Sequence, residues 1–391
     1  MLSTVLFCRL YYIINLIMVP NILENFNLEK IKKLNIFSNP LKMFFPKRMV
    51  GVDIGTSSIK IVELSRWGQG KTLENYGEIK SASLYKESFR SAEKGSYLLS
   101  NYFVSRAIRG ILDEAKIRTK SVIFSIPDFS TFCTSFDLPP MSFDELNDAV
   151  YYNASQYIPL PVTETTLDWQ LIAGSPGDKK SNLKIFLVAI PNQTVQDYQK
   201  VAQMAGLDLY AVEAEVMGLT RALIRDVKSC ICLVDIGVQS TTINIIDRKK
   251  MKRSYSFDFA GSQLTYGIAS ALGLSHTEAE GLKNREGLTS SKEEISKTLY
   301  LLVDPLVIEV KKILADFYQQ ENKEVDTVYL TGGTSSLPGL KEYFHETLKK
   351  NVEIPNCFSE LLYPPILGQT LEELSPTFSV ATGVALGGLE T

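Results

Sequence analysis

Residues 50–64 read Val-Gly-Val-Asp-Ile-Gly-Thr-Ser-Ser-Ile-Lys-Ile-Val-Glu-Leu, and the architecture of the chain can be worked out from this stretch. Apolar and β-branched residues alternate on both sides of Gly55, which indicates a strand, a tight turn and a second strand. The pattern returns in residues 230–246, Cys-Ile-Cys-Leu-Val-Asp-Ile-Gly-Val-Gln-Ser-Thr-Thr-Ile-Asn-Ile-Ile, with six identical residues at a constant offset of 182. The sequence therefore contains an internal duplication, and we expect two similar α/β halves that each open with this hairpin.

Both turns carry the residue types that a phosphate or metal site needs. Gly55 and Gly237 allow the backbone to bend close to a ligand. Hydroxyl, amide and cationic side chains follow them, namely Thr56, Ser57 and Lys60 in the first turn and Gln239, Ser240 and Thr241 in the second. Asp53 and Asp235 end the preceding strands, where a hydrated Mg²⁺ can be held. One Asp-x-Gly turn alone is usually only a β-turn, but two equivalent copies favour a paired site.

A third glycine-rich loop follows in residues 328–339, Val-Tyr-Leu-Thr-Gly-Gly-Thr-Ser-Ser-Leu-Pro-Gly. This pattern predicts a strand, a loop at Gly332, Gly333 and Thr334, and a helix that starts near Pro338. A glycine pair before a helix N-terminus presents bare backbone N–H groups to an anion or a nucleotide base. Gly-Gly loops also form plain turns, so this loop indicates a nucleotide site only in combination with the other two.

The composition excludes several classes of protein. The chain of 391 residues has 44 acidic and 41 basic side chains and a net charge of −3, which argues against binding to nucleic-acid phosphates. Two histidines and five cysteines without a Cys-x-x-Cys pair argue against a zinc site or a disulfide framework and favour a reducing compartment. We therefore expect the body of the protein to be cytoplasmic.

Residues 1–42 differ in composition from the rest of the chain. Their longest uncharged apolar run, residues 10–20, has 11 residues, whereas about 20 are needed to span a bilayer. Three interpretations stay open: an upstream stretch before a true start at Met43, a membrane-surface or partner-binding arm, and a cleaved or inserted segment. Of these we expect the first, a true start at Met43.

In their order and spacing the three loops resemble the two phosphate motifs and the adenosine motif of the actin-like ATPases, which include actin, sugar kinases, heat-shock chaperones and FtsA. Within this superfamily the chain is most similar to the PilM family of type IV pilus assembly. The similarity covers about residues 43–389 and is carried by residues 50–64, 138–161, 167–170, 260–265 and 381–387.

The resemblance implies an actin-like ATPase fold of the α/β class, with two RNase-H-like domains around a nucleotide cleft. It places the first domain at 43–228, with a small FtsA-type α/β subdomain inserted at about 130–190. The second domain then covers 229–391, with a small subdomain at about 266–324.

The resemblance also implies roles for individual residues in binding ATP and Mg²⁺. Asp53 and Asp235 match the aspartates associated with Mg²⁺, and Glu280 and Lys283 match the pair that flanks adenine and ribose. The remaining nucleotide contacts are implied for Gly55, Thr56, Ser57 and Lys60, for Gly237, Gln239, Ser240 and Thr241, for Gly261 and Gln263, and for Gly332, Gly333 and Thr334. Glu280 and Lys283 at i, i+3 would otherwise be an ordinary surface ion pair.

For hydrolysis, the position that orients water in related ATPases is matched by Glu215 or Glu213. Either carboxylate would equally suit the N-terminus of the helix expected at 215–226. The resemblance implies at most slow ATPase activity.

The partner implied by the resemblance is the cytoplasmic N-terminal peptide of a PilN-like bitopic inner-membrane protein. It would lie between the helix that Ser142 and Glu145 cap and the first domain, and would place the protein peripherally at the inner membrane. Tyr151, Tyr152 and Tyr157 on that helix are expected in core or groove packing. The alternatives are an FtsA-like division anchor and a turnover ATPase or small-molecule kinase of the same fold.

Overall fold

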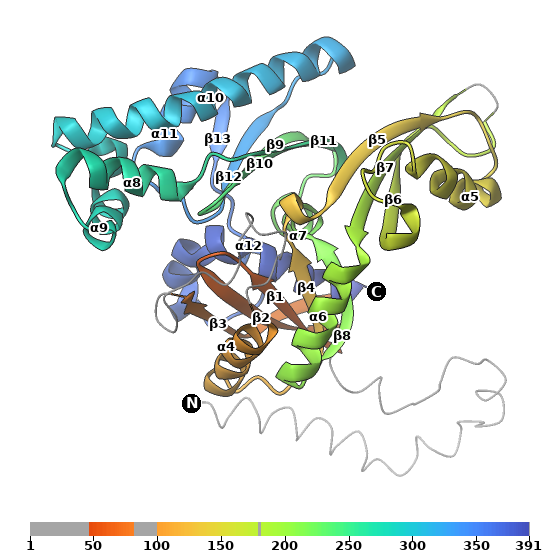
Figure 1. Ribbon diagram of the computed structural model, residues 1–391, viewed down its shortest axis with the longest axis horizontal. Helices are drawn as coiled ribbons and strands as arrows, with labels where there is room; N and C mark the ends of the chain where they lie inside the picture. The colour runs from red at the N-terminus through yellow and green to blue at the C-terminus, as the bar shows by residue number, and fades with distance from the viewer. Residues whose placement is uncertain (1–46, 82–99, 179–180, 391) are drawn as a thin grey trace, which may run out of the picture. The chain divides into compact units, whose positions relative to one another are not determined.

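The computed structural model describes residues 47–81, 100–178 and 181–390, so the expectations for residues 1–42 lie outside the described part. The first half is built on a five-stranded sheet in the order β3-β2-β1-β4-β8 (Figure 1). Antiparallel pairing joins β1 (Lys47–Ile54), β2 (Ser58–Trp67) and β3 (Gly70–Lys80). Parallel pairing adds β4 (Ser121–Ile126) and β8 (Asp208–Ala214) on the other side of β1.

The second half repeats this topology in the order β11-β10-β9-β12-β13. Its strands are β9 (Cys230–Ile236), β10 (Thr241–Asp247), β11 (Lys250–Phe257), β12 (Thr327–Thr331) and β13 (Asn351–Glu353). The first three are antiparallel and the last two parallel, as in the first half. The two predicted turns also match, because the N–H of Gly55 donates to Ser58 O and that of Gly237 donates to Ser240 O, both at 2.9 Å.

Side-chain alternation along β9 decides how the second sheet is buried. Cys232 and Val234 face one core, which they share with α8 (Gly261–Leu272), α10 (Glu293–Glu321) and α11 (Leu340–Leu348). Ile231 and Leu233 face the opposite side and belong to the core of the first half. The second sheet is therefore apolar on both faces, and α9 (His276–Glu286) packs outside α8.

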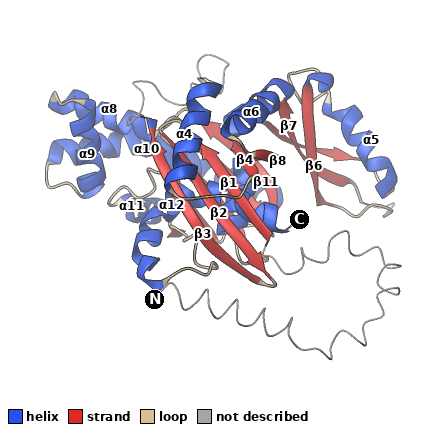
Figure 2. Cartoon of the chain, turned by 90° about the horizontal axis from the view of Figure 1, so that it is seen from below, coloured by secondary structure: helices blue, strands red, loops and turns tan. Residues whose placement is uncertain are grey.

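Helices cover both faces of the first sheet as well. Figure 2 shows α4 (Asn101–Glu114) and α6 (Asn192–Ala205) lying across one face. The other face packs against α12 (Gly368–Glu390), which also contacts α7 (Glu215–Leu223). Although α12 is the last element of the chain, it packs mainly against the first sheet. Small residues allow this contact: a Cβ on Gly383 would lie 1.9 Å from Gly218 O.

A small subdomain lies between β4 and α6 in the chain. It consists of the sheet β5-β7-β6 and one helix, with β5 (Phe132–Leu138), α5 (Phe143–Ala154), β6 (Thr165–Ala173) and β7 (Leu183–Pro191). A capping box of Ser142 and Glu145 begins α5, as the sequence predicts. Tyr151 and Tyr152 are exposed on α5 and take no part in the core, so of the two expected kinds of packing only the groove is left for them.

Short 3₁₀ turns complete the chain at η3 (Asp128–Ser130), η4 (Val162–Glu164), η5 (Gly287–Thr289) and η6 (Pro365–Leu367). Within the described ranges, the helices all fall short of the length or hydrophobicity needed to cross a bilayer.

Candidate functional site

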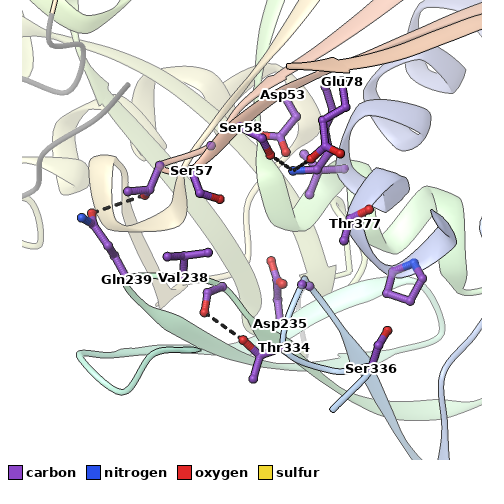
Figure 3. Close-up of a pocket in the computed structure, with 18 of the residues that line it drawn as sticks. Asp53, Ser57, Ser58, Glu78, Asp235, Val238, Gln239, Thr334, Ser336 and Thr377 are labelled. Atoms are coloured by element: carbon purple, nitrogen blue, oxygen red, sulfur yellow. Dashed lines mark hydrogen bonds and ion pairs between the residues drawn. The ribbon is translucent and has the colours of Figure 1, made fainter. Parts of the chain in front are cut away.

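The three glycine-containing loops line one cavity of about 470 Å³ between the two halves. The first turn contributes Gly55, Thr56, Ser57 and Lys60, the second Gly237, Gln239 and Ser240, and the third loop Gly332, Gly333 and Thr334. A side-chain hydrogen bond spans the cavity, because Thr56 Oγ1 donates to Gln239 Oε1 at 3.3 Å (Figure 3). Residues that lie far apart in sequence thus form one site.

The third loop is held against both halves. Gly332 has a φ of +83°, and a Cβ added there would lie 2.3 Å from Asp235 Oδ1. Its N–H donates to Pro376 O on α12 at 3.0 Å, and the N–H of Thr334 donates to Ile236 O at 3.1 Å. Only glycine fits this conformation and this approach together. The backbone of the loop therefore contacts the second turn and α12 directly.

Asp53 and Asp235 approach the cavity from opposite halves, at the ends of β1 and β9 (Figure 3). Ser125 Oγ donates to Asp53 Oδ1 at 3.0 Å. Burial, together with the negative charges of Asp128 and Asp53, raises the pKa of Asp235 to about 7, although Lys60 opposes the shift. Bringing these carboxylates together without a cation is therefore unfavourable, as expected where a divalent ion binds.

Two carboxylates are too few to hold a metal ion with protein ligands alone, but they are enough for a Mg²⁺ ion that also binds water and phosphate. Across the described residues, no three or more His, Cys, Asp or Glu side chains gather as a metal cluster. Mg²⁺ usually keeps several waters and binds to one or two carboxylates plus phosphate oxygens. The donor set of Asp53 and Asp235 therefore fits Mg²⁺ only in combination with water and a phosphate ligand.

Glu280 and Lys283 form a pair in which the lysine is buried and the glutamate is half-exposed, unlike an ordinary surface pair. Lys283 is only 5% exposed, and its Nζ donates to Glu280 Oε2 at 2.7 Å, Thr265 Oγ1 at 3.0 Å and Gly261 O at 3.2 Å. Burial opposes ionisation of Glu280, but hydrogen bonds from Lys283, Thr265 and Asn284 lower its pKa overall. Both residues line the cavity, so α9 presents a fixed charged pair to it.

The two carboxylates considered for orienting water lie in different places. Glu215, the first residue of α7, lines the cavity. Glu213 does not; it accepts two hydrogen bonds from Arg221, at 2.6 and 3.0 Å. A bidentate pair with arginine holds both carboxylate oxygens. Of these two candidates, Glu215 is the one that lines the cavity.

Three further expected residues lie outside the cavity lining. Thr241 opens β10 with a buried side chain, and the next residue, Thr242, lines the cavity because side chains alternate along a strand. Gln263 Nε2 donates to Asp258 O at 3.0 Å on the surface of α8.

Gly261 is the third, and it supports the loops instead of lining the cavity. Its N–H donates to Gly237 O at 3.0 Å, and a Cβ there would lie 2.3 Å from Thr334 Oγ1. This glycine therefore allows the second and third loops to pack together.

Sequence reasoning missed several lining residues. Glu78 and Lys80 come from β3, Asn284 from α9, Ser336 from the third loop, and Glu373 and Thr377 from α12. One of them could have been predicted. Glu78 lies opposite Lys60 in the hairpin of β2 and β3, and Lys60 was already expected at the site. Lys60 Nζ lies 2.7 Å from Ser58 Oγ and 3.8 Å from Glu78 Oε1 (Figure 3). The α12 residues had no local signal, because a tertiary contact brings them to the site.

A second cavity of about 480 Å³ lies beside α7 and the C-terminal end of α12. Its walls include Gln170 of β6, Met217 and Thr220 of α7, and Met251 of β11. Its charged lining consists of the cations Lys71, Arg221, Arg225 and Lys249 and the acids Glu360 and Glu390. The small subdomain thus contributes to a wall of this cavity through Gln170 of β6.

Comparison with known proteins gives consistent matches. A family model described as type IV pilus assembly protein PilM matches residues 51–389. Cell division protein FtsA from Enterococcus faecalis is 24% identical over 351 residues, which cover 78% of this chain and 78% of that relative.

Solved structures agree on the fold. The structure titled PilM-PilN type IV pilus biogenesis complex superposes with a TM-score of 0.75 at 23% identity, over 88% of this chain and 99% of the other. Ethanolamine utilization protein EutJ from Carboxydothermus hydrogenoformans gives 0.53 at 18% identity, over 88% and 90%. The predicted actin-like ATPase fold is confirmed.

Proposed function

Because the chain belongs to the type IV pilus assembly protein PilM family, we propose that it is an ATP-binding cytoplasmic scaffold of the pilus assembly platform at the inner membrane. One observation carries the nucleotide part of the proposal: the three loops, which belong to different halves, line a single cavity. The family match favours pilus assembly over an FtsA-like role in division.

In this proposal the two turns hold the phosphates and the third loop holds the nucleoside. Backbone N–H groups and hydroxyls beside Gly55 and Gly237 would bind phosphate oxygens, and Lys60 would add a positive charge. Glu280 and Lys283 would lie beside the base and ribose. Asp53 and Asp235 would hold Mg²⁺ through water, and the ion would neutralise phosphate charge.

Calorimetry of ATP binding in Mg²⁺ tests this assignment with Asp53→Asn and Asp235→Asn. Each variant removes one carboxylate charge, so we expect affinity at least about tenfold weaker, or about 1.4 kcal/mol. Asp137→Asn, an exposed position on β5, is the matched control and should bind as the wild type does. Equal affinity in all four proteins would overturn the nucleotide assignment.

The partner in this proposal is the N-terminal cytoplasmic peptide of a PilN-like bitopic membrane protein. Family membership supports it, and the similar solved structure is a complex of PilM with PilN. The second cavity is the groove that we propose for the peptide, because the small subdomain and the first half both wall it. Membrane attachment would then come from the partner.

Thr220→Arg tests the docking groove, since it places a large side chain where Thr220 of α7 lines the second cavity. We expect the wild-type chain to retain a bitopic inner-membrane protein from a membrane extract and the variant to retain much less of it. Lys200→Ala on the exposed side of α6 serves as the control. Failure of the wild-type chain to capture any inner-membrane protein would contradict the scaffold proposal.

Turnover is the second candidate, and the position of Glu215 at the cavity favours it. A carboxylate there could orient water against a terminal phosphate, while most of the rate would come from positioning and charge neutralisation. Phosphate release above background that is lost in Glu215→Gln, with ATP affinity unchanged, would establish an ATPase. Release at background in both proteins would leave binding as the function.

A further inference from the structure

The outer face of α10 carries an exposed apolar stripe with charged ends. We define the α10 stripe as Glu294, Lys297, Leu301, Pro305, Ile308 and Lys312, which follow one another at spacings of three or four residues. Leu301 is 73% exposed and Ile308 50%. The opposite face, with residues such as Leu299 and Val303, fills the core of the second half. Figure 1 shows α10 along the outer edge of that half.

Charge along the stripe is ordered. Glu293 and Glu294 begin the helix, and Lys311 and Lys312 follow the apolar section. Two copies placed side by side in parallel would set Glu294 against Glu294 and Lys312 against Lys312. Two antiparallel copies would set Glu294 against Lys312, so like charges repel in one arrangement and opposite charges attract in the other.

We propose that the α10 stripe pairs with the α10 stripe of a second copy of this chain. The two helices run antiparallel, and the two-fold axis passes between Leu301 and Pro305. In this register Leu301 of each copy packs on Pro305 of the other. The charged ends match as well, since Glu294 of each copy meets Lys312 of the other. A self-complementary patch of this kind is what a two-fold interface requires.

The existing ion pairs do not oppose this arrangement. Lys297 Nζ lies 2.6 Å from Glu293 Oε1, and Lys312 Nζ lies 3.0 Å from Glu309 Oε2, both within the helix. The Lys297–Glu293 pair is exposed, and such pairs contribute only about 0–1 kcal/mol. Glu294 to Lys312 spans about 27 Å of helix at 1.5 Å per residue, which gives a small interface. The pairing is therefore weak and favoured where a partner concentrates copies at a surface.

Sedimentation equilibrium of the full chain over a wide concentration range, at low salt and without nucleotide, tests the pairing. The wild type should show a reversible monomer–dimer equilibrium that higher salt weakens. Leu301→Glu should weaken it at least about tenfold, because it places a charge in the apolar centre. Glu342→Gln on α11 is the control and should dimerise as the wild type does.

Charge reversal distinguishes the antiparallel register from any other. Glu294→Lys and Lys312→Glu should each weaken the dimer, because each sets like charges against each other across the interface. The double variant carries both changes and should regain the wild-type affinity. Thermal unfolding checks that all variants fold, since substitutions at exposed positions usually change stability by less than about 0.5 kcal/mol. A monomeric wild type, a dimer unaffected by Leu301→Glu, or no recovery in the double variant would overturn the proposal.

Discussion

At Gly332 the backbone has a φ of +83° and passes so close to Asp235 that a Cβ would lie 2.3 Å from its carboxylate oxygen. The neighbouring Gly333 differs, because a Cβ there would meet only Thr377 Cγ2, at 3.9 Å. Glycine therefore occurs at these two positions for different reasons. Gly332 is required by conformation and contact, whereas Gly333 leaves open space toward the cavity.

We predict that Gly332→Ala destabilises the chain and weakens ATP binding, while Gly333→Ala leaves the stability nearly unchanged. Holding a non-glycine residue in this region of φ costs about 1–3 kcal/mol, and the Cβ must also displace Asp235. Urea denaturation and calorimetry on both variants measure the two effects. Equal loss of stability in the two variants would contradict this account of the loop.

Asp128 is buried where η3 of the first half approaches β10 of the second. Its side chain is 6% exposed, and Oδ2 finds no hydrogen-bond partner among the described residues. Burial raises its pKa to about 6 from an ordinary value of 3.8, partly opposed by a hydrogen bond from Val216 N. In the same region, Asn244 Oδ1 also lacks a partner within the described chain.

Asp128→Asn should therefore stabilise the chain at high pH. Between about pH 4 and 6 the unfolded chain has lost the Asp128 proton and the folded chain still holds it, so the free energy of unfolding falls as pH rises. The variant lacks this loss, and we expect a gain of about 3 kcal/mol at pH 8 that shrinks to about 1 kcal/mol at pH 4.5. Urea denaturation without nucleotide at both pH values, with Asp137→Asn as control, measures it. A gain independent of pH would contradict the assignment.

At the scale of elements, α12 packs closely against β1 and α7 through small residues. A Cβ on Gly51 of β1 would lie 2.1 Å from Ala381 O, and one on Gly383 would lie 1.9 Å from Gly218 O. Both distances are far below van der Waals contact, so the backbones themselves touch. This contact brings Glu373, Pro376 and Thr377 to the candidate site.

Gly383→Ala should separate α12 from α7 and lower the free energy of unfolding by about 1–3 kcal/mol, the usual cost of overpacking. Gly368→Ala in the same helix is the matched control, because a Cβ there meets nothing within 4 Å. Alanine also favours helix over glycine by about 1 kcal/mol, so the control should be neutral or slightly stabilising. Thermal and urea unfolding compare the two, and a Gly383→Ala protein as stable as the control would refute this packing.

The elements also show what the sequence could and could not predict. Local patterns predicted both hairpins and the Ser142 cap, because each depends on residues that are neighbours in sequence or repeat at one offset, whereas the cleft shared by three loops was implied by the resemblance to actin-like ATPases. Thr242 was overlooked in favour of Thr241, since the motif does not specify which side of β10 faces the cavity. Thr377 was missed for another reason, because the docking of α12 is decided by tertiary packing.

At the scale of the whole molecule, the small subdomain contacts both halves. It is inserted in the first, and β5 and β6 pack next to β11 of the second. Lys184 of β7 lies 3.2 Å from Glu321 at the end of α10, and Arg253 of β11 lies 3.7 Å from the same carboxylate. These cations lower the pKa of Glu321 against the opposing effect of burial. These ion pairs therefore join the small subdomain to the second half at residues outside the lining of the first cavity.

If the proposed function holds, this contact should couple ATP binding to peptide docking in the second cavity, whose walls come from the small subdomain and both halves. ATP should change peptide affinity by a factor of about 5–150, and the peptide must change ATP affinity by the same factor, because binding linkage is reciprocal. Lys184→Ala should bring both factors close to one while each ligand still binds alone. Lys200→Ala, whose ion pair with Asp197 lies within α6, should leave them unchanged. Fluorescence anisotropy with a labelled PilN-type peptide, with and without ATP, measures the factors, and coupling that survives Lys184→Ala in full would exclude this contact as its route.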